Sequence, residues 1–198
     1  LSPNGELLGL SCVYVDSGVV KSRIAFYNFG QVGEGKSDYY VNGYTYPDTI
    51  IPLIRFMSNG TAYALGDDRL LFFSGTQIPQ VTNIHLYEEE IQAVYSNENY
   101  VGVLLRNNST EAQHRLQVYQ GTGEKVGEYL FNQDFDSLFF GQDSFTVYNE
   151  QECLVHTFGG VVKFQGEFDK SVRVMIPQGN SYRYLILTND SIDTIQLK

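Results

Sequence analysis

The sequence predicts an all-β protein built from a repeated unit of antiparallel strands, and three observations support this prediction. Aromatic residues make up 14% of the 198-residue chain, with 15 Tyr and 13 Phe beside 19 Gly. This composition is typical of pleated sheets and tight turns. Apolar residues alternate with period two, and no segment forms an amphipathic helix of useful length. The third observation is a strand pattern that recurs along the whole chain.

The recurring pattern is an apolar strand that ends in an aromatic residue or His, with Gly following a few residues later. Its first four copies end at Tyr27, Phe73, Tyr119 and His156, and a fifth copy without the Gly ends at Ile195. The copies recur about every 42 residues, close to the roughly 40–45 residues of a four-stranded propeller blade. The sequence therefore predicts a β-propeller-like fold of about five four-stranded blade units.

Each copy has the same upstream neighbours. A strand precedes the copies at residues 7–15, 62–65, 100–105, 144–148 and 184–188. A further short apolar run precedes four of these strands, at residues 52–56, 91–95, 138–140 and 172–176. The unit thus consists of three strands and a weaker outer strand, the order found in a propeller blade. We expect one domain, 1–198, with approximate units 1–51, 52–90, 91–134, 135–170 and 171–198.

A helix is the alternative for residues 88–95, which contain good helix formers and an acidic run. The apolar residues Ile91, Ala93 and Tyr95 nevertheless alternate with period two. We therefore predict a loop followed by a strand.

The two ends of the chain predict an incomplete ring. The first unit lacks its first strand, and the last unit stops after its third strand. The turn Ser2-Pro3-Asn4-Gly5 resembles the one that joins the first two strands of many WD-like blades, so we expect the remaining blades upstream. An open arc exposes strand edges and apolar blade faces. We therefore expect pairing between copies, as a homodimer through open blade edges.

Charge narrows the choice of partners. The formal net charge is −10, from 23 acidic and 13 basic residues. Nucleic acids and anionic membrane surfaces require a basic face, so neither is expected as a partner. No run of 18 apolar residues is present, so we expect contact with a membrane only through an anchor outside this chain.

Cys12 and Cys153 both lie in apolar alternating runs. We interpret them as two buried thiols. A single long-range disulfide between them is the alternative, and spacing alone does not decide it.

No set of residues predicts catalysis, a cofactor or a metal. His85, His114 and His156 are scattered over different units, and His156 takes the place of an aromatic residue in the repeat, which predicts packing. Asp134 and Asp136 project to one side of an extended segment and make a weak calcium candidate at most. The run 88–90 of three Glu is interpreted as a solvated loop, since adjacent like charges repel when buried.

The segment 39–47 is the richest unusual feature of the sequence. It holds the four tyrosines Tyr39, Tyr40, Tyr44 and Tyr46, which could form an aromatic surface for a glycan or peptide. The alternative, which we favour, is an outer strand whose rings pack between blades. Exposure of the rings discriminates between the two.

Several segments together resemble a known family. They are Ser2-Pro3-Asn4-Gly5-Glu6, the strand 24–30, Gly66-Asp67-Asp68 and the closing residues 195–198. The chain resembles a domain-of-unknown-function family of Gram-positive, Clostridia-type bacteria, whose members resemble WD-repeat and quinoprotein-like propellers. The resemblance implies an N-terminal transmembrane helix and an extracytoplasmic propeller. It transfers no catalytic residues.

These observations predict a non-catalytic binding, sensing or scaffolding module of the bacterial cell envelope. Its partner would be a protein or a polysaccharide. The alternative is a hydrolase, for example one acting on a glycan, with acidic residues at the mouth of the central channel. A purely structural platform is a third option, because propellers host many unrelated tasks.

Overall fold

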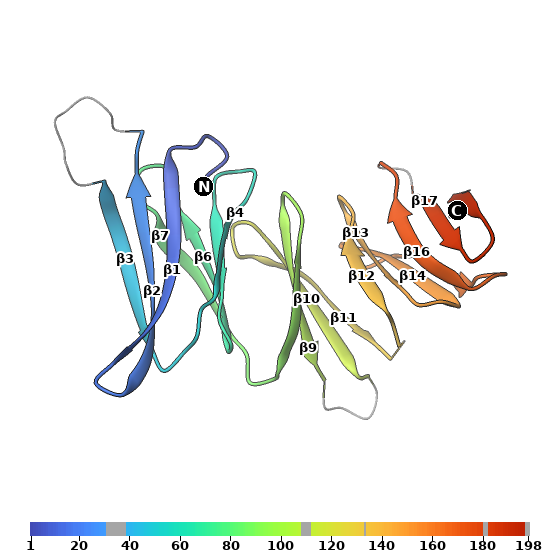
Figure 1. Cartoon of the computed structure of the whole chain (residues 1–198), viewed down its shortest axis with the longest axis horizontal. Coiled ribbons are helices and arrows are strands. Elements are labelled where there is room, and N and C mark those ends of the chain that lie inside the picture. The colour runs from blue at the N-terminus through green and yellow to red at the C-terminus, as the bar shows by residue number, and fades with distance from the viewer. Residues whose placement is uncertain (31–38, 108–111, 133, 180–181, 197–198) are drawn as a thin grey trace.

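The computed structural model describes residues 1–30, 39–107, 112–132, 134–179 and 182–196. Within these ranges the chain forms β-strands joined by turns, with no helix. The strands form five antiparallel sheets, and each strand pairs with its neighbour along the chain (Figure 1). The all-β prediction is confirmed.

The sheets are numbered here in chain order. Sheet 1 contains β1 (Leu7–Asp16), β2 (Val19–Asn28) and β3 (Tyr40–Pro47). Sheet 2 contains β4 (Leu53–Phe56), β5 (Ala62–Leu65), β6 (Arg69–Ser74) and β7 (Gln80–Leu86). Sheet 3 contains β8 (Ile91–Ser96), β9 (Tyr100–Arg106), β10 (His114–Gln120) and β11 (Lys125–Phe131). Sheet 4 contains β12 (Ser137–Phe140), β13 (Ser144–Tyr148), β14 (Glu152–Thr157) and β15 (Val162–Glu167). Sheet 5 contains β16 (Val172–Pro177), β17 (Arg183–Thr188) and β18 (Ile192–Gln196).

The loop and strand predicted for residues 88–95 are also found, because β8 begins at Ile91. The boundaries of the five predicted units and the single-domain assignment stay predictions. Each sheet nevertheless falls inside one of the expected ranges.

The repeat found in the sequence has a structural counterpart. Four sheets carry an outermost strand after the repeated strand, and the pairing between the two shifts register at the same place each time. The shift lies immediately before the last residue of the repeat: Tyr27, Phe73, Tyr119 and His156. An extra residue in one strand increases the local twist. The sequence pattern therefore marks the point where each outer strand is turned.

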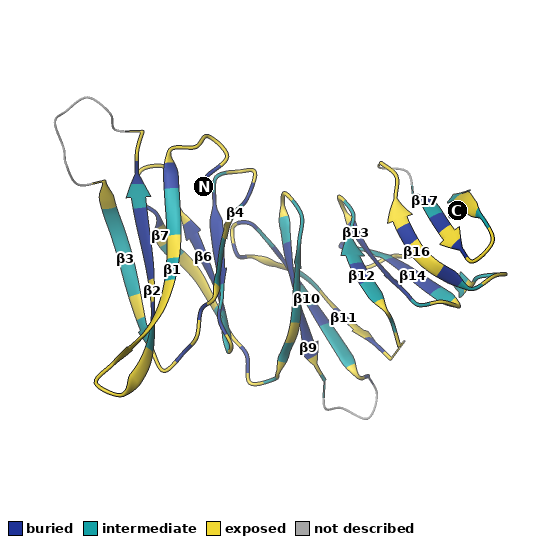
Figure 2. Ribbon diagram, in the orientation of Figure 1, coloured by how far each residue is buried: buried dark blue, intermediate teal, exposed yellow. Residues whose placement is uncertain are grey.

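The hydrophobic core is divided among the interfaces between successive sheets. Leu71 and Phe73 of sheet 2 pack against Ile24 and Phe26 of sheet 1. Three further clusters join sheets 2 and 3, sheets 3 and 4, and sheets 4 and 5. Burial of each large apolar side chain stabilises the fold by about 1.5–3 kcal/mol. Figure 2 shows this burial on the inner strands of each sheet.

The five sheets form a single row from the N-terminus to the C-terminus (Figure 1). Sheets 1 and 5 lie at opposite ends of this row, and the described strands do not close into a ring. One side of sheet 1 and one side of sheet 5 are therefore left without a neighbouring sheet. Both sides carry exposed apolar side chains, such as Leu10 on sheet 1 and Ile192 on sheet 5.

Candidate interaction surface

The uncovered side of sheet 1 carries a row of apolar and aromatic side chains. β1 and β2 pair without interruption over their whole length, from Leu7 opposite Asn28 to Asp16 opposite Val19. Successive side chains on a strand point to opposite faces, so one set of alternate residues faces away from sheet 2. We call this set, with the neighbouring rings of β2 and β3, the first open face: Leu8, Leu10, Cys12, Tyr14, Tyr27 and Tyr40.

The opposite set of residues fixes the orientation of the first open face. A Cβ atom at Gly9 would lie 2.8 Å from Cδ1 of Ile54 in sheet 2, so β1 and β4 approach closely here. The Ser11 hydroxyl donates to the carbonyl oxygen of Ile51. With this side held against sheet 2, Leu10 and Tyr14 remain 40% and 38% exposed on the other.

Tyrosine and arginine side chains extend the first open face toward β3. The rings of Tyr27 and Tyr40 meet edge to face, with centroids 5.8 Å apart. The Arg23 guanidinium lies 5.8 Å from the centre of the Tyr40 ring. Its hydrogen bond to the Tyr40 hydroxyl raises the pKa of Arg23, so this cation persists at every physiological pH. The face therefore combines apolar contact area with a fixed positive charge.

The structure separates the four tyrosines of the predicted surface into two pairs. Tyr39 and Tyr40 are 41% and 37% exposed, and the Tyr39 ring lies 4.9 Å from that of Phe29. Tyr44 instead packs on Phe73 of sheet 2 at 5.7 Å between ring centroids. Tyr46 packs in the same interface, with the Arg69 guanidinium 5.8 Å from its ring centre.

Tyr44 and Tyr46 thus pack between blades, as the alternative favoured in the sequence analysis predicts. Tyr39 and Tyr40 are instead exposed, as a binding surface requires. A ligand-binding role for the four residues stays a prediction.

Sheet 5 presents a second open face at the other end of the row. Val174 pairs with Leu187, and Leu187 pairs with Ile192, so the three side chains share one side. They are 38%, 39% and 66% exposed. The opposite side of the sheet packs against sheet 4 through Met175 and Ile186.

The two cysteines differ, and the expectation of two buried thiols is wrong for one of them. Cys153 is buried, and its burial raises the pKa of this thiol to about 12. Cys12 is exposed in the middle of the first open face. Both thiols are free, so the disulfide alternative does not hold in this structure.

The histidines are not brought together into one site. His156 lies between the rings of Tyr129 and Phe145, at 4.6 and 5.4 Å, which confirms its predicted packing role. His85 lies 4.3 Å from the Tyr119 ring and bonds to the Gly123 carbonyl.

The acidic candidates lie apart from one another. Asp134 and Asp136 are exposed, and the part of the chain that the structure describes contains no cluster of three or more His, Cys, Asp or Glu residues able to hold a metal ion. In the acidic run, Glu89 and Glu90 pair with Arg115 and Arg106. Among the described residues, the carboxyl groups with a clearly shifted pKa are Asp16, Asp68 and Glu128, and all three are lowered.

The sequence did carry a signal for the first open face. β1 is apolar on both alternate sets of residues, and such a strand is typical of a sheet covered on both sides. Sheet 2 covers one side, and no sheet of this structure covers the other. The described residues also include no long apolar helix that could span a bilayer.

Comparison with known proteins agrees with this architecture. A family of unknown function (DUF5711) matches residues 1–197, and no curated protein matches the sequence. Hsv2p of Kluyveromyces lactis is similar in structure, with a TM-score of 0.50 and 11% identity over 92% of this chain and 58% of that one. The β-propeller domain of the Trilobed protease from Pyrococcus furiosus, described as having an open velcro topology, has a TM-score of 0.51 and 10% identity over 95% and 67% of the two chains. At such identities the similarity shows the fold alone, which is propeller-like.

Proposed function

The chain belongs to DUF5711, a family of unknown function, and we propose that it is a non-catalytic binding, sensing or scaffolding module. The observation that carries this proposal is the first open face, an apolar sheet surface that a partner or further blades of the same protein would cover. Monomeric proteins rarely expose large contiguous apolar patches, and such patches mark sites of interaction. Here a rigid sheet, held by an unbroken ladder of paired residues, presents Leu10, Tyr14 and Tyr40 together.

The chemistry of the first open face favours a protein or polysaccharide partner. Tyrosine rings offer both apolar area and a hydroxyl, which suits a peptide or the face of a sugar ring. The net charge of −10 disfavours nucleic acid as a partner.

The cellular location is part of the proposal. Resemblance to the Clostridia-type family supports the extracytoplasmic face of the cell membrane, with an anchor outside the residues of this chain. The hydrolase alternative stays a prediction, and no particular cluster of described residues favours it.

Cys12 provides a direct test of this proposal. A thiol-reactive photo-cross-linker should attach to Cys12, which is exposed, and spare Cys153, whose buried thiol has a pKa of about 12. Labelled protein, irradiated with envelope extract from a bacterium that encodes it, should capture a discrete partner. The additional substitution Leu10→Asp should reduce capture at least severalfold, because it places a charge in the apolar contact.

A matched control places the same label elsewhere on the molecule. The variant Cys12→Ser with Glu124→Cys carries the cross-linker on the exposed turn between β10 and β11. Equal capture from both positions, or capture that Leu10→Asp leaves unchanged, would show that the first open face is not the binding surface.

A further inference from the structure

Sheet 5 differs from the other sheets at its outer edge. In sheets 1 to 4 an outermost strand pairs with the repeated strand, and these outer strands are β3, β7, β11 and β15. In sheet 5 the repeated strand is β18, and no described strand pairs with its outer side. An open strand edge is a template for pairing with another extended segment.

The pairing of β17 with β18 shows which backbone groups of this edge point outward. The carbonyl oxygen of Ser191 accepts a hydrogen bond from the β17 residue opposite it. Hydrogen-bonded pairs alternate with non-bonded pairs along an antiparallel ladder. Asp193 and Ile195 therefore bond to β17. The N–H and C=O groups of Ile192 and Thr194 are directed away from β17, toward the open edge.

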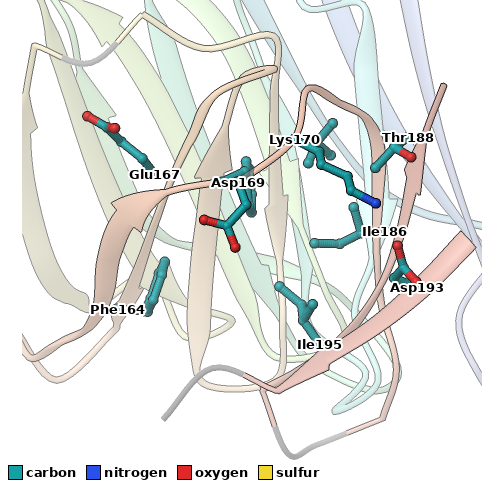
Figure 3. Close-up of a pocket in the computed structure, with 10 residues that line it drawn as sticks. Phe164, Glu167, Asp169, Lys170, Ile186, Thr188, Asp193 and Ile195 are labelled. Atoms are coloured by element: carbon teal, nitrogen blue, oxygen red, sulfur yellow. The ribbon is translucent and has the colours of Figure 1, made fainter. Parts of the chain in front are cut away.

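An open cavity of about 390 Å³ lies beside this edge, on the side that faces sheet 4 (Figure 3). Asp193 and Ile195 of β18 line it from sheet 5, and Phe164 of β15 lines it from sheet 4. Val172 and Ile186 also line the cavity and are almost fully buried. The cavity is therefore continuous with the core of the interface between sheets 4 and 5.

Sheet 2 shows how an outer strand fills the corresponding space. Val81 of β7 lies opposite Phe73, the last residue of the repeated strand, and packs into the interface with sheet 1. The equivalent residues of the other outer strands are Tyr40, Lys125 and Val162. In sheet 5 this place lies opposite Ile195. A side chain that an added strand carries there points into the cavity.

The chemistry of the edge selects the residues of the added strand. Ile195 and Phe164 favour an apolar side chain opposite Ile195. Because each outer strand shifts register at this point, the next side chain directed to the same side follows three residues later, opposite Asp193. A basic residue is favoured there, because opposite charges on directly paired residues attract.

We propose that β18 binds an extended segment of a partner protein as a fourth, antiparallel strand. The segment carries an apolar residue opposite Ile195 and a lysine or arginine three residues later, opposite Asp193. Its backbone bonds to the outward groups of Ile192 and Thr194. Main-chain bonds of this kind supply affinity, and the contacts of alternate side chains supply specificity. This edge does not include the first open face, so its test is independent of the function proposed above.

The outer strand β7 supplies a probe for this edge. The probe is a synthetic peptide with the sequence of residues 79–88, in which Ile84→Lys introduces the basic residue. If it docks as β7 does in sheet 2, Val81 lies opposite Ile195 and the lysine lies opposite Asp193. The matched control peptide also carries Val81→Asp, which places a charge against the apolar wall and should prevent binding.

Amide hydrogen exchange gives a direct signature of strand addition. At millimolar peptide, exchange should slow at Ile192 and Thr194, whose N–H groups point outward. Exchange at Asp193 and Ile195 should not change, because their amides already bond to β17. Slowing at all four residues, or none at millimolar peptide, would overturn the proposal. Slowing that increases with protein concentration in the absence of peptide would assign the edge to a second copy, and would overturn it as well.

Two sets of variants test the backbone and the charge separately. Thr194→Pro removes one outward N–H and leaves the bonds to β17, so it should abolish binding, whereas Thr194→Val should bind as the wild type does. Asp193→Lys should weaken binding of the probe roughly two- to fivefold, and a peptide with Ile84→Glu should restore it. Wild-type binding by Thr194→Pro, or equal binding of the probe and the control peptide, would show that the peptide does not add to β18.

Discussion

Gly102 determines how closely sheets 3 and 4 approach each other. A Cβ atom at this position would lie 2.2 Å from Cζ of Phe140 and about 3 Å from two further atoms of the same ring. The Phe140 ring is itself held between Tyr95 and Phe158, at 6.1 and 4.9 Å. These two rings restrict the movement of Phe140, so the ring cannot easily make room for a side chain at position 102. The packing of sheets 3 and 4 therefore requires glycine there.

Gly102→Ala should therefore destabilise the protein by about 1–3 kcal/mol, the usual cost of overpacking a core. The measurement is the free energy of unfolding from urea denaturation. Gly159→Ala is the control, because its Cβ would meet nothing closer than Thr157 at 3.8 Å. The control should change stability by less than about 0.5 kcal/mol. Equal stability of the two variants would contradict the packing described here.

The tyrosines of β3 show where prediction from sequence stops at this scale. Strict alternation places Tyr40 and Tyr44 on the same face of a strand. In the structure they lie on opposite faces, because the register shift leaves Val41 without a partner and moves Tyr40 opposite Tyr27. A one-residue shift reverses every side chain beyond it. The pattern of tyrosines showed an aromatic strand, and the bulge decided which rings are exposed.

The turn between β5 and β6 shows how side chains connect one element to the next. The Thr49 hydroxyl, in the segment between β3 and β4, bonds to the carboxylates of Asp67 and Asp68 at 2.6 and 3.0 Å. Arg69 donates two hydrogen bonds to Asp68, at 2.6 and 2.8 Å. The bonds from Arg69 are the main cause of the lowered pKa of Asp68. This turn therefore ties sheet 2 to the end of sheet 1.

A pKa below the ordinary value of 3.8 means that the folded state favours the ionised Asp68. Its contribution is fully present above that value and is lost as pH falls through the lower folded pKa. The Asp68 side chain is 45% exposed, so solvent limits the contribution to about 1 kcal/mol or less. Asp68→Asn should lower the urea midpoint at pH 6, and the difference from wild type should shrink in strong acid. A difference that does not depend on pH would exclude this ionisation as its cause.

The elements themselves were predictable to different degrees. The repeated strand and its upstream neighbours, such as β5 and β13, lie in the centre of their sheets, and burial on both faces gives them continuous apolar runs. The outer strands β7, β11 and β15 were not located from the sequence. They pair on one side only, and side chains such as Ile84 and Leu130 are about half exposed, so their residues alternate weakly.

At the scale of the whole molecule, the two open faces predict self-association. Both are apolar sheet surfaces, and exposed sheets favour contact between copies. Sedimentation velocity or light scattering should show dimers that increase with concentration. Leu10→Asp should shift the equilibrium toward monomer, whereas Ile84→Asp, at a 50% exposed position of β7, should not. A monomer over a wide concentration range would contradict the predicted homodimer.

The sequence predicted that some apolar sheet faces would be open, but it did not predict which side of each sheet is open. Apolar residues on both alternate sets of β1 and β16 indicated sheets with two covered sides, but this pattern does not say which side lacks a cover in this structure. Cys12 illustrates the difficulty, because it stands among apolar residues and yet faces outward.

The division of the core into separate interfaces has a consequence for cooperativity. Each hydrophobic cluster joins adjacent sheets, so the stability of the row is close to a sum of nearest-neighbour couplings. A closed ring has no weakest end, whereas a linear array loses its terminal members first. Sheet 5 has three strands and packs on one neighbouring sheet, so we expect stepwise unfolding to begin at an end of the row such as this one.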